Sequence, residues 1–312
     1  MVLGFFVMGG FLLGMDFERL NEFNLKSFYV HKAKRFLPLL LIALGLGVVA
    51  SAVKHWLLPS EYGLFPCPEY CSASNLSFII LFYNVPLWYM TVYISFIILA
   101  PFFYSVYSCN CTKPVIILLL LSVIVSICLY MGANSDLNIL RHGNGDLYYS
   151  AIYRMWQFVL GLTAAKISCS FFKTRKVNNL LAIILMFVFI GVALMAMILK
   201  EGIYWGISNR SIGSDLCAAL YFAVIIPCFY FSDVHFSKSG YKIAAYAAVL
   251  SYPIYLFHDL IYMVRRLPEI LNWEPLPNYV VAISCFLITV AISVCLIKVE
   301  RKIMAPNLKT TV

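Results

Sequence analysis

The segment 243–263 carries the residues best suited to chemistry. Ser251, Tyr255, His258 and Tyr262 follow helical spacing, so a helix would place them on one face. An imidazole titrates near neutral pH and can act as a general base toward a hydroxyl group. A histidine inside a membrane also serves as a structural hydrogen-bonding group, and the spacing does not decide between these two roles. Pro253 would disturb the backbone hydrogen bonds of this helix.

A second polar face lies within segment 76–107. Its members at helical spacing are Asn84, Trp88, Thr91 and Ser95, and Tyr93 lies beside them. An aromatic-rich helix that only packs against its neighbours would show the same spacing, so a substrate-binding face and a packing face are both open.

The sequence also leaves the roles of two arginines open. Arg154 lies just inside an apolar segment, where it could take part in chemistry or extend its charge to the membrane surface. Arg35 belongs to a basic group that includes Lys32 and Lys34. Such a group can bind the phosphates of a nucleotide-like donor, or it can simply mark the cytoplasmic side of the membrane.

The composition places these residues in a membrane protein. The chain has 312 residues, of which 62% are hydrophobic and only 12% are charged. This excludes an ordinary water-soluble enzyme, because soluble domains have roughly 25% charged residues. The net charge of +9 comes from dispersed lysines and arginines rather than a patch, so we expect no nucleic-acid partner.

We expect an all-α, polytopic transmembrane bundle of about nine helices, because apolar segments in lipid must satisfy their backbone hydrogen bonds internally. The expected segments are 1–15, 36–53, 76–107, 114–131, 151–165, 180–199, 215–231, 243–263 and 279–297. The connections are short, so residues 1–312 are predicted to form a single membrane-embedded domain with no separate soluble domain.

The connections between the expected helices, taken alternately and with the C-terminal tail, form two sets that lie on opposite sides of the membrane. The two sets differ in their number of lysines and arginines. One set contains sixteen of the 23 lysines and arginines and the other contains six, which predicts a cytoplasmic C-terminus. Nine spans would then leave the N-terminus outside, although Met1 opens directly on apolar sequence. We therefore expect a preceding helix, giving ten in all; a short anchor with its N-terminus outside is the alternative. The small residues of the first segment, Gly4, Gly9, Gly10 and Gly14, predict close helix packing.

The cysteines indicate no disulfide scaffold. Cys67 and Cys71 flank a polar loop and could pair if that loop faces an oxidising compartment. Their spacing could also belong to a metal site, but no second pair or nearby histidine completes one, so we predict no metal.

Several fragments, in this order, resemble the integral-membrane acyltransferase 3 family. They are residues 5–13 (Phe-Phe-Val-Met-Gly-Gly-Phe-Leu-Leu), 34–39 (Lys-Arg-Phe-Leu-Pro-Leu), 86–90 (Pro-Leu-Trp-Tyr-Met) leading to Pro101, 154–161, and 250–258 (Leu-Ser-Tyr-Pro-Ile-Tyr-Leu-Phe-His). The resemblance spans nearly the entire chain.

The resemblance implies a multi-pass enzyme of the plasma (inner) membrane. It would transfer an acyl group, commonly acetyl from cytoplasmic acetyl-CoA, to a hydroxyl of a surface or exported glycan. No bound cofactor is implied; acyl-CoA, a carbohydrate acceptor and the lipid bilayer are the expected partners. The candidate catalytic residues are His258 and Arg154, and the candidate substrate-binding residues are Arg35, Trp88, Tyr93 and Tyr255.

The chain departs from the family pattern in three places. The family's first helix normally supplies an arginine and a histidine thought to act as base, whereas this sequence begins at what resembles the second helix. Tyr93 stands where many members have glutamate, and Gly9 replaces a usual serine. If Met1 is the true start, we expect weak or no catalysis. A transporter or flippase of a polar or lipid-linked substrate, or a non-catalytic partner of a glycan-assembly enzyme, would have a similar composition.

Overall fold

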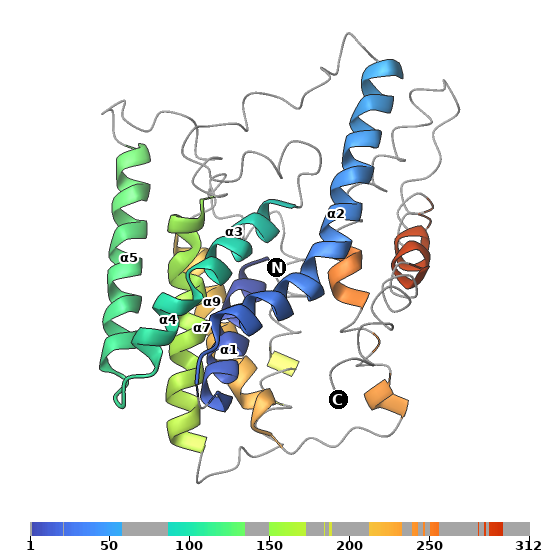
Figure 1. The fold of residues 1–312 in the computed structure, drawn as a ribbon. Coiled ribbons are helices and arrows are strands. Elements are labelled where there is room, and N and C mark those ends of the chain that lie inside the picture. The colour runs from blue at the N-terminus through green and yellow to red at the C-terminus, as the bar shows by residue number, and fades with distance from the viewer. Residues whose placement is uncertain are drawn as a thin grey trace. The chain divides into compact units, whose positions relative to one another are not determined.

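The computed structural model describes a set of helices along the chain (Figure 1). The described residues are 2–20, 22–57, 87–134, 150–172, 184, 187–188, 212–232, 239–242, 246, 250–255, 280, 284 and 287–295. They form α-helices and no β-strand, in agreement with the all-α expectation. Cys67, Cys71 and His258 lie outside the described residues, so their predictions stay predictions.

Contacts between residues group the chain into two units. The first unit contains residues 1–23 and 91–235, and the second contains residues 24–90 and 236–312. The helices of the first unit are α1 (Val2–Arg19), the larger part of α3 (Leu87–Ile98), α4 (Ala100–Tyr107), α5 (Lys113–Asn134), α7 (Ala151–Phe172) and α9 (Ile212–Tyr230). The second unit contains α2 (Leu25–Leu57) and the described helical residues after 236.

The core of the first unit is the packing of α1 against α7. This is its most extensive helix contact, followed by α5 against α7 and α1 against α9. The predicted role of the N-terminal glycines is confirmed: Gly10 and Gly161 lie where the backbones of α1 and α7 meet, and Gly14 faces Ala165. Small residues allow two helices to approach this closely in lipid, where van der Waals packing drives association.

Aromatic rings fill the space around this contact. Phe158 of α7 lies 4.7 Å from Phe96 and 5.5 Å from Phe103, measured between ring centroids. Phe6 of α1 meets Phe96 edge-on at 5.9 Å. The three elements α1, α7 and the α3–α4 pair are therefore joined through one buried aromatic group.

Several helix boundaries differ from the expected ones. The stretch 16–35 was expected to be a connection, but α1 continues to Arg19 and α2 already begins at Leu25. Asn24 explains the early start, because its Oδ1 accepts a 3.0 Å hydrogen bond from the Ser27 N–H as an N-cap does. Pro38, which would lie in the first turn of a helix that began at residue 36, consequently lies inside α2.

The expected single helix over 76–107 is also wrong in its described part. Helices α3 and α4 meet at Leu99 with a bend of 56°. Pro101 occupies the first turn of α4, where a proline starts a helix readily and cannot continue the preceding one.

Two described helices are long and apolar enough to cross a membrane, namely Lys113–Met131 and Ala151–Phe172. The bent pair α3–α4 would make a third, and Ala218–Tyr230 is a shorter apolar helix. The described residues thus confirm membrane-type helices, while the number nine stays a prediction.

Candidate active site

Helix α7 carries the most buried polar pair among the described residues of the first unit. Arg154 and Gln157 are each 0% exposed, although both lie in a helix long and apolar enough to cross a membrane. Their separation of three residues places them on the same helical face. Polar residues at such positions are costly and usually serve a function, so this face of α7 is the centre of the candidate site.

The surroundings of Arg154 decide one question that the sequence left open. A side chain that extended toward the membrane surface would be exposed at its tip, whereas Arg154 is fully buried. Its guanidinium lies over the ring of Tyr153, with the central carbon 5.2 Å from the ring centroid. Ser126 of α5 donates a 3.0 Å hydrogen bond to the Tyr153 carbonyl, which ties this turn of α7 to α5.

Gln157 is the residue that the sequence predictions missed. Its amide nitrogen and oxygen are buried, and neither has a hydrogen-bond partner among the described residues. The available signal was a polar residue one turn after Arg154 in an apolar segment.

Tyr93 lies in the same unit as Arg154. Its ring meets Phe158 edge-on, with 6.3 Å between the centroids, and it also lies against Gly9 of α1. The ring is partly exposed. Tyr93 therefore flanks the α1–α7 contact. Gly9 lies where a Cβ would come within 2.8 Å of the Tyr93 ring, so a larger residue at position 9 would displace that ring.

The remaining candidates belong to the second unit. Arg35 is exposed on α2, with its guanidinium carbon 5.6 Å from the Phe36 ring centroid. Tyr255 packs edge-on against Tyr89, the residue after Trp88, at 5.4 Å between centroids. Trp88 lies in the first turn of α3, and its side chain is outside the description, as is all of His258. The structure thus brings Tyr255 to the start of α3, and the roles of Trp88 and His258 stay predictions.

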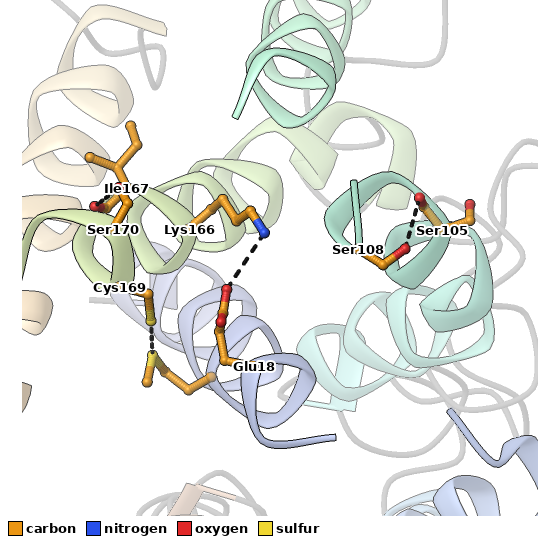
Figure 2. A network of polar contacts seen from close by, with 8 residues as sticks. Glu18, Ser105, Ser108, Lys166, Ile167, Cys169 and Ser170 are labelled. Carbon is orange, nitrogen blue, oxygen red and sulfur yellow. Dashed lines mark hydrogen bonds and ion pairs between the residues drawn. The ribbon is translucent and has the colours of Figure 1, made fainter. Parts of the chain in front are cut away.

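A polar pocket of about 400 Å³ lies at the ends of α1 and α7 that the charge pattern predicts to be cytoplasmic. Its lining residues are Glu18, Asn110, Thr112, Lys166, Cys169, Ser170 and Phe231. Figure 2 shows Lys166 and Cys169 reaching from α7 to α1, where Lys166 pairs with Glu18 at 3.6 Å and Cys169 contacts Met15 at 3.5 Å. Because Lys166 is already paired with a carboxylate, the described lining residues offer no excess positive charge for the phosphates of a CoA donor.

The ion pair in this pocket should contribute little to stability. Lys166 and Glu18 are 17% and 35% exposed, and water screens such pairs. We expect Glu18→Gln to lower the free energy of unfolding by less than about 1 kcal/mol. Thermal unfolding of the detergent-solubilised protein at low and high salt measures this, and the difference from wild type should shrink at high salt.

The matched control is Glu22→Gln, since Glu22 is exposed and forms no ion pair within the described part of the chain. A loss of several kcal/mol in Glu18→Gln alone would show that the pair is held in a much drier environment.

The described residues form helices, two of these helices are long and apolar enough to cross a membrane, and α7 buries a polar pair, as expected of a membrane protein. The family model for the acyltransferase domain, acyltransferase 3, matches residues 2–298. The chain therefore belongs to this family of membrane acyltransferases. No curated protein and no solved structure matches it.

Proposed function

We propose that this protein transfers an acyl group, most simply acetyl, from a cytoplasmic CoA thioester to a hydroxyl of a cell-surface or exported glycan. The observation that supports this most directly is a fully buried arginine in an apolar helix of an acyltransferase-family chain. Acyl transfer develops negative charge on the carbonyl oxygen, and a buried guanidinium in a low-dielectric site stabilises such charge strongly. We assign this role to Arg154.

The other candidates take roles that fit their chemistry. His258 would be the general base that removes the proton from the acceptor hydroxyl. Arg35, exposed among basic residues in the first third of α2, would bind donor phosphate. Trp88, Tyr93 and Tyr255 would contact the substrates through their rings and hydroxyl groups.

The test is transfer of radiolabelled acetyl from acetyl-CoA to the glycan fraction of membranes from the native host. We expect base-labile label in that fraction with wild type, and a loss of roughly 10²-fold or more with His258→Ala, since general bases contribute about 10²–10⁴-fold. His55→Ala is the matched control, a histidine with no assigned role.

Two outcomes would contradict the proposal. Glycan that crosses the membrane without gaining label would point to a transporter instead. Equal labelling by His258→Ala and wild type, at equal amounts of protein, would remove His258 from the mechanism.

A further inference from the structure

The buried polar side chains near the site differ in how their hydrogen bonds are satisfied. On α7, Thr163 donates to the Val159 carbonyl at 2.8 Å, and on α5, Ser126 donates to Tyr153. Each hydroxyl thus finds a backbone acceptor. Gln157 differs, because its amide is 0% exposed and both of its polar atoms lack a partner among the described residues.

An amide in this state destabilises the protein. Buried polar groups are nearly always hydrogen-bonded, and one without partners costs more than an apolar side chain of the same shape would. A methionine at position 157 would fill similar volume without that cost. Groups that lower stability in this way persist where a ligand satisfies them, because stability and function are in conflict at binding sites.

The chemistry of the amide narrows the class of ligand. The Gln157 side chain offers a donor and an acceptor side by side. A sugar hydroxyl can accept from the one and donate to the other, whereas a thioester carbonyl or an ionised phosphate only accepts. The amide therefore suits a sugar hydroxyl better than the thioester or the phosphates of CoA, and its position along α7 must decide between the sugar and the amide-bearing pantetheine arm of CoA.

The position along α7 points to the same ligand. Gln157 lies six residues after Ala151, the first residue of the helix, which at the rise of an α-helix is about 9 Å. The distribution of basic residues predicts that this end of α7 faces away from the cytoplasm. Arg154 lies one turn nearer that end on the same face, so an acceptor held by Gln157 would lie beside the proposed oxyanion-stabilising group.

We propose that the Gln157 amide binds and orients a hydroxyl group of the carbohydrate acceptor next to Arg154. This inference rests on the proposed function. Gln157 is then a residue that positions the acceptor, and its loss should affect transfer without weakening the fold.

The experiment compares wild type, Gln157→Met, Gln157→Glu and the control Thr163→Val. Transfer of label from acetyl-CoA to the glycan fraction of native membranes is measured per molecule of folded protein, over a range of acetyl-CoA concentrations. The melting temperature of each purified full-length variant is measured in a detergent without a sugar headgroup, so that the detergent does not compete for the amide.

For Gln157→Met we expect at least a tenfold loss of transfer, an unchanged half-saturating concentration of acetyl-CoA, and a melting temperature equal to or above that of wild type. Gln157→Glu keeps the length and a hydrogen-bond acceptor, but its carboxylate would compete with the oxyanion for Arg154, so it should transfer no more than Gln157→Met. Thr163→Val should leave transfer per folded molecule unchanged. This opposite movement of stability and transfer is the result that a purely structural glutamine would not give.

Three results would overturn the inference while leaving the proposed function intact: full transfer by Gln157→Met, a melting temperature that falls in step with its transfer, or a raised half-saturating concentration of acetyl-CoA. A wild type that transfers no label would overturn the proposed function itself, and this inference with it. The two failures are distinguished by the wild type: it transfers no label if the proposed function is wrong, and it transfers label normally if only the role of Gln157 is wrong.

Discussion

Gly10→Ala should strongly lower the amount of folded protein in the membrane. We expect this variant to show the largest loss of stability that the addition of one methyl group causes. A Cβ at position 10 would lie 1.9 Å from the carbonyl oxygen of Phe158 and 2.9 Å from its carbonyl carbon. Both are backbone atoms of α7, so no side-chain rotation relieves the clash. The helices would have to separate along the most extensive contact of the unit, which we expect to cost about 3 kcal/mol, the upper end for overpacking.

Gly161 makes the reciprocal contact from α7. A Cβ there would lie 2.0 Å from the Val7 carbonyl oxygen and 2.8 Å from the Phe11 nitrogen. Gly161→Ala should therefore be about as damaging as Gly10→Ala. Because both changes push the same two helices apart, the double variant should lose less stability than the two single losses added together.

The matched control is Gly45→Ala in α2. A Cβ at position 45 would meet nothing within 4 Å, and alanine is the better helix former by about 0.5–1 kcal/mol. The amount of protein in the membrane and the melting temperature in detergent measure all four variants. We expect Gly45→Ala to match or exceed wild type, and a Gly10→Ala protein equally stable would show that α1 and α7 do not meet at these glycines.

This packing shows how much of the fold the sequence predicts. Apolar segments 114–131, 151–165 and 215–231 are all helical, and the spacing of small residues in the first segment correctly indicates a closely packed helix. Both features depend on local composition and period, which the sequence displays directly. The partner of that helix, α7, depends on contacts between distant residues and could not be read from either.

The predicted ends of several helices are wrong for a different physical reason. Hydrophobicity locates the part of a helix that lies in lipid, but lysine, arginine and glutamate are also good helix formers. Helix α1 therefore continues through Glu18 and Arg19, and α2 includes the basic residues around Arg35, whereas α7 reaches Phe172 through a stretch that contains only one such residue, Lys166. Pro101 could have predicted the bend at Leu99. The prediction missed it because the sequence is apolar on both sides of the bend.

The candidate site is only partly predictable. The sequence identifies Arg154 as a polar residue in an apolar segment. Only its burial shows that the side chain does not extend to the membrane surface, and that burial depends on the residues that α1 and α5 pack around α7. For Gln157 the sequence shows a polar residue in an apolar segment, but the lack of a hydrogen-bond partner among the described residues is seen only in the structure. His258 and Trp88 rest on the family resemblance.

Arg154→Lys should lower acyl transfer by about 10²–10³-fold, the loss typical when one group that stabilises an oxyanion is removed. Lysine keeps the charge but replaces a planar fork of donors with a single flexible ammonium, so it cannot reproduce the geometry of the guanidinium. It also loses the planar packing over the Tyr153 ring, where the guanidinium carbon lies 5.2 Å from the centroid. The same labelled-acetyl assay on native membranes measures the loss.

Arg19→Lys provides the matched control in the same unit. Arg19 is exposed and donates a 2.5 Å hydrogen bond to the Tyr230 hydroxyl, which an ammonium can replace. This variant should transfer acetyl as wild type does. The melting temperature of Arg154→Lys separates chemistry from folding: the charge remains buried at the same position, so we expect a small change in stability beside a large change in transfer. Equal transfer by the two lysine variants would show that the buried charge alone suffices and that the guanidinium fork has no part in stabilising the oxyanion.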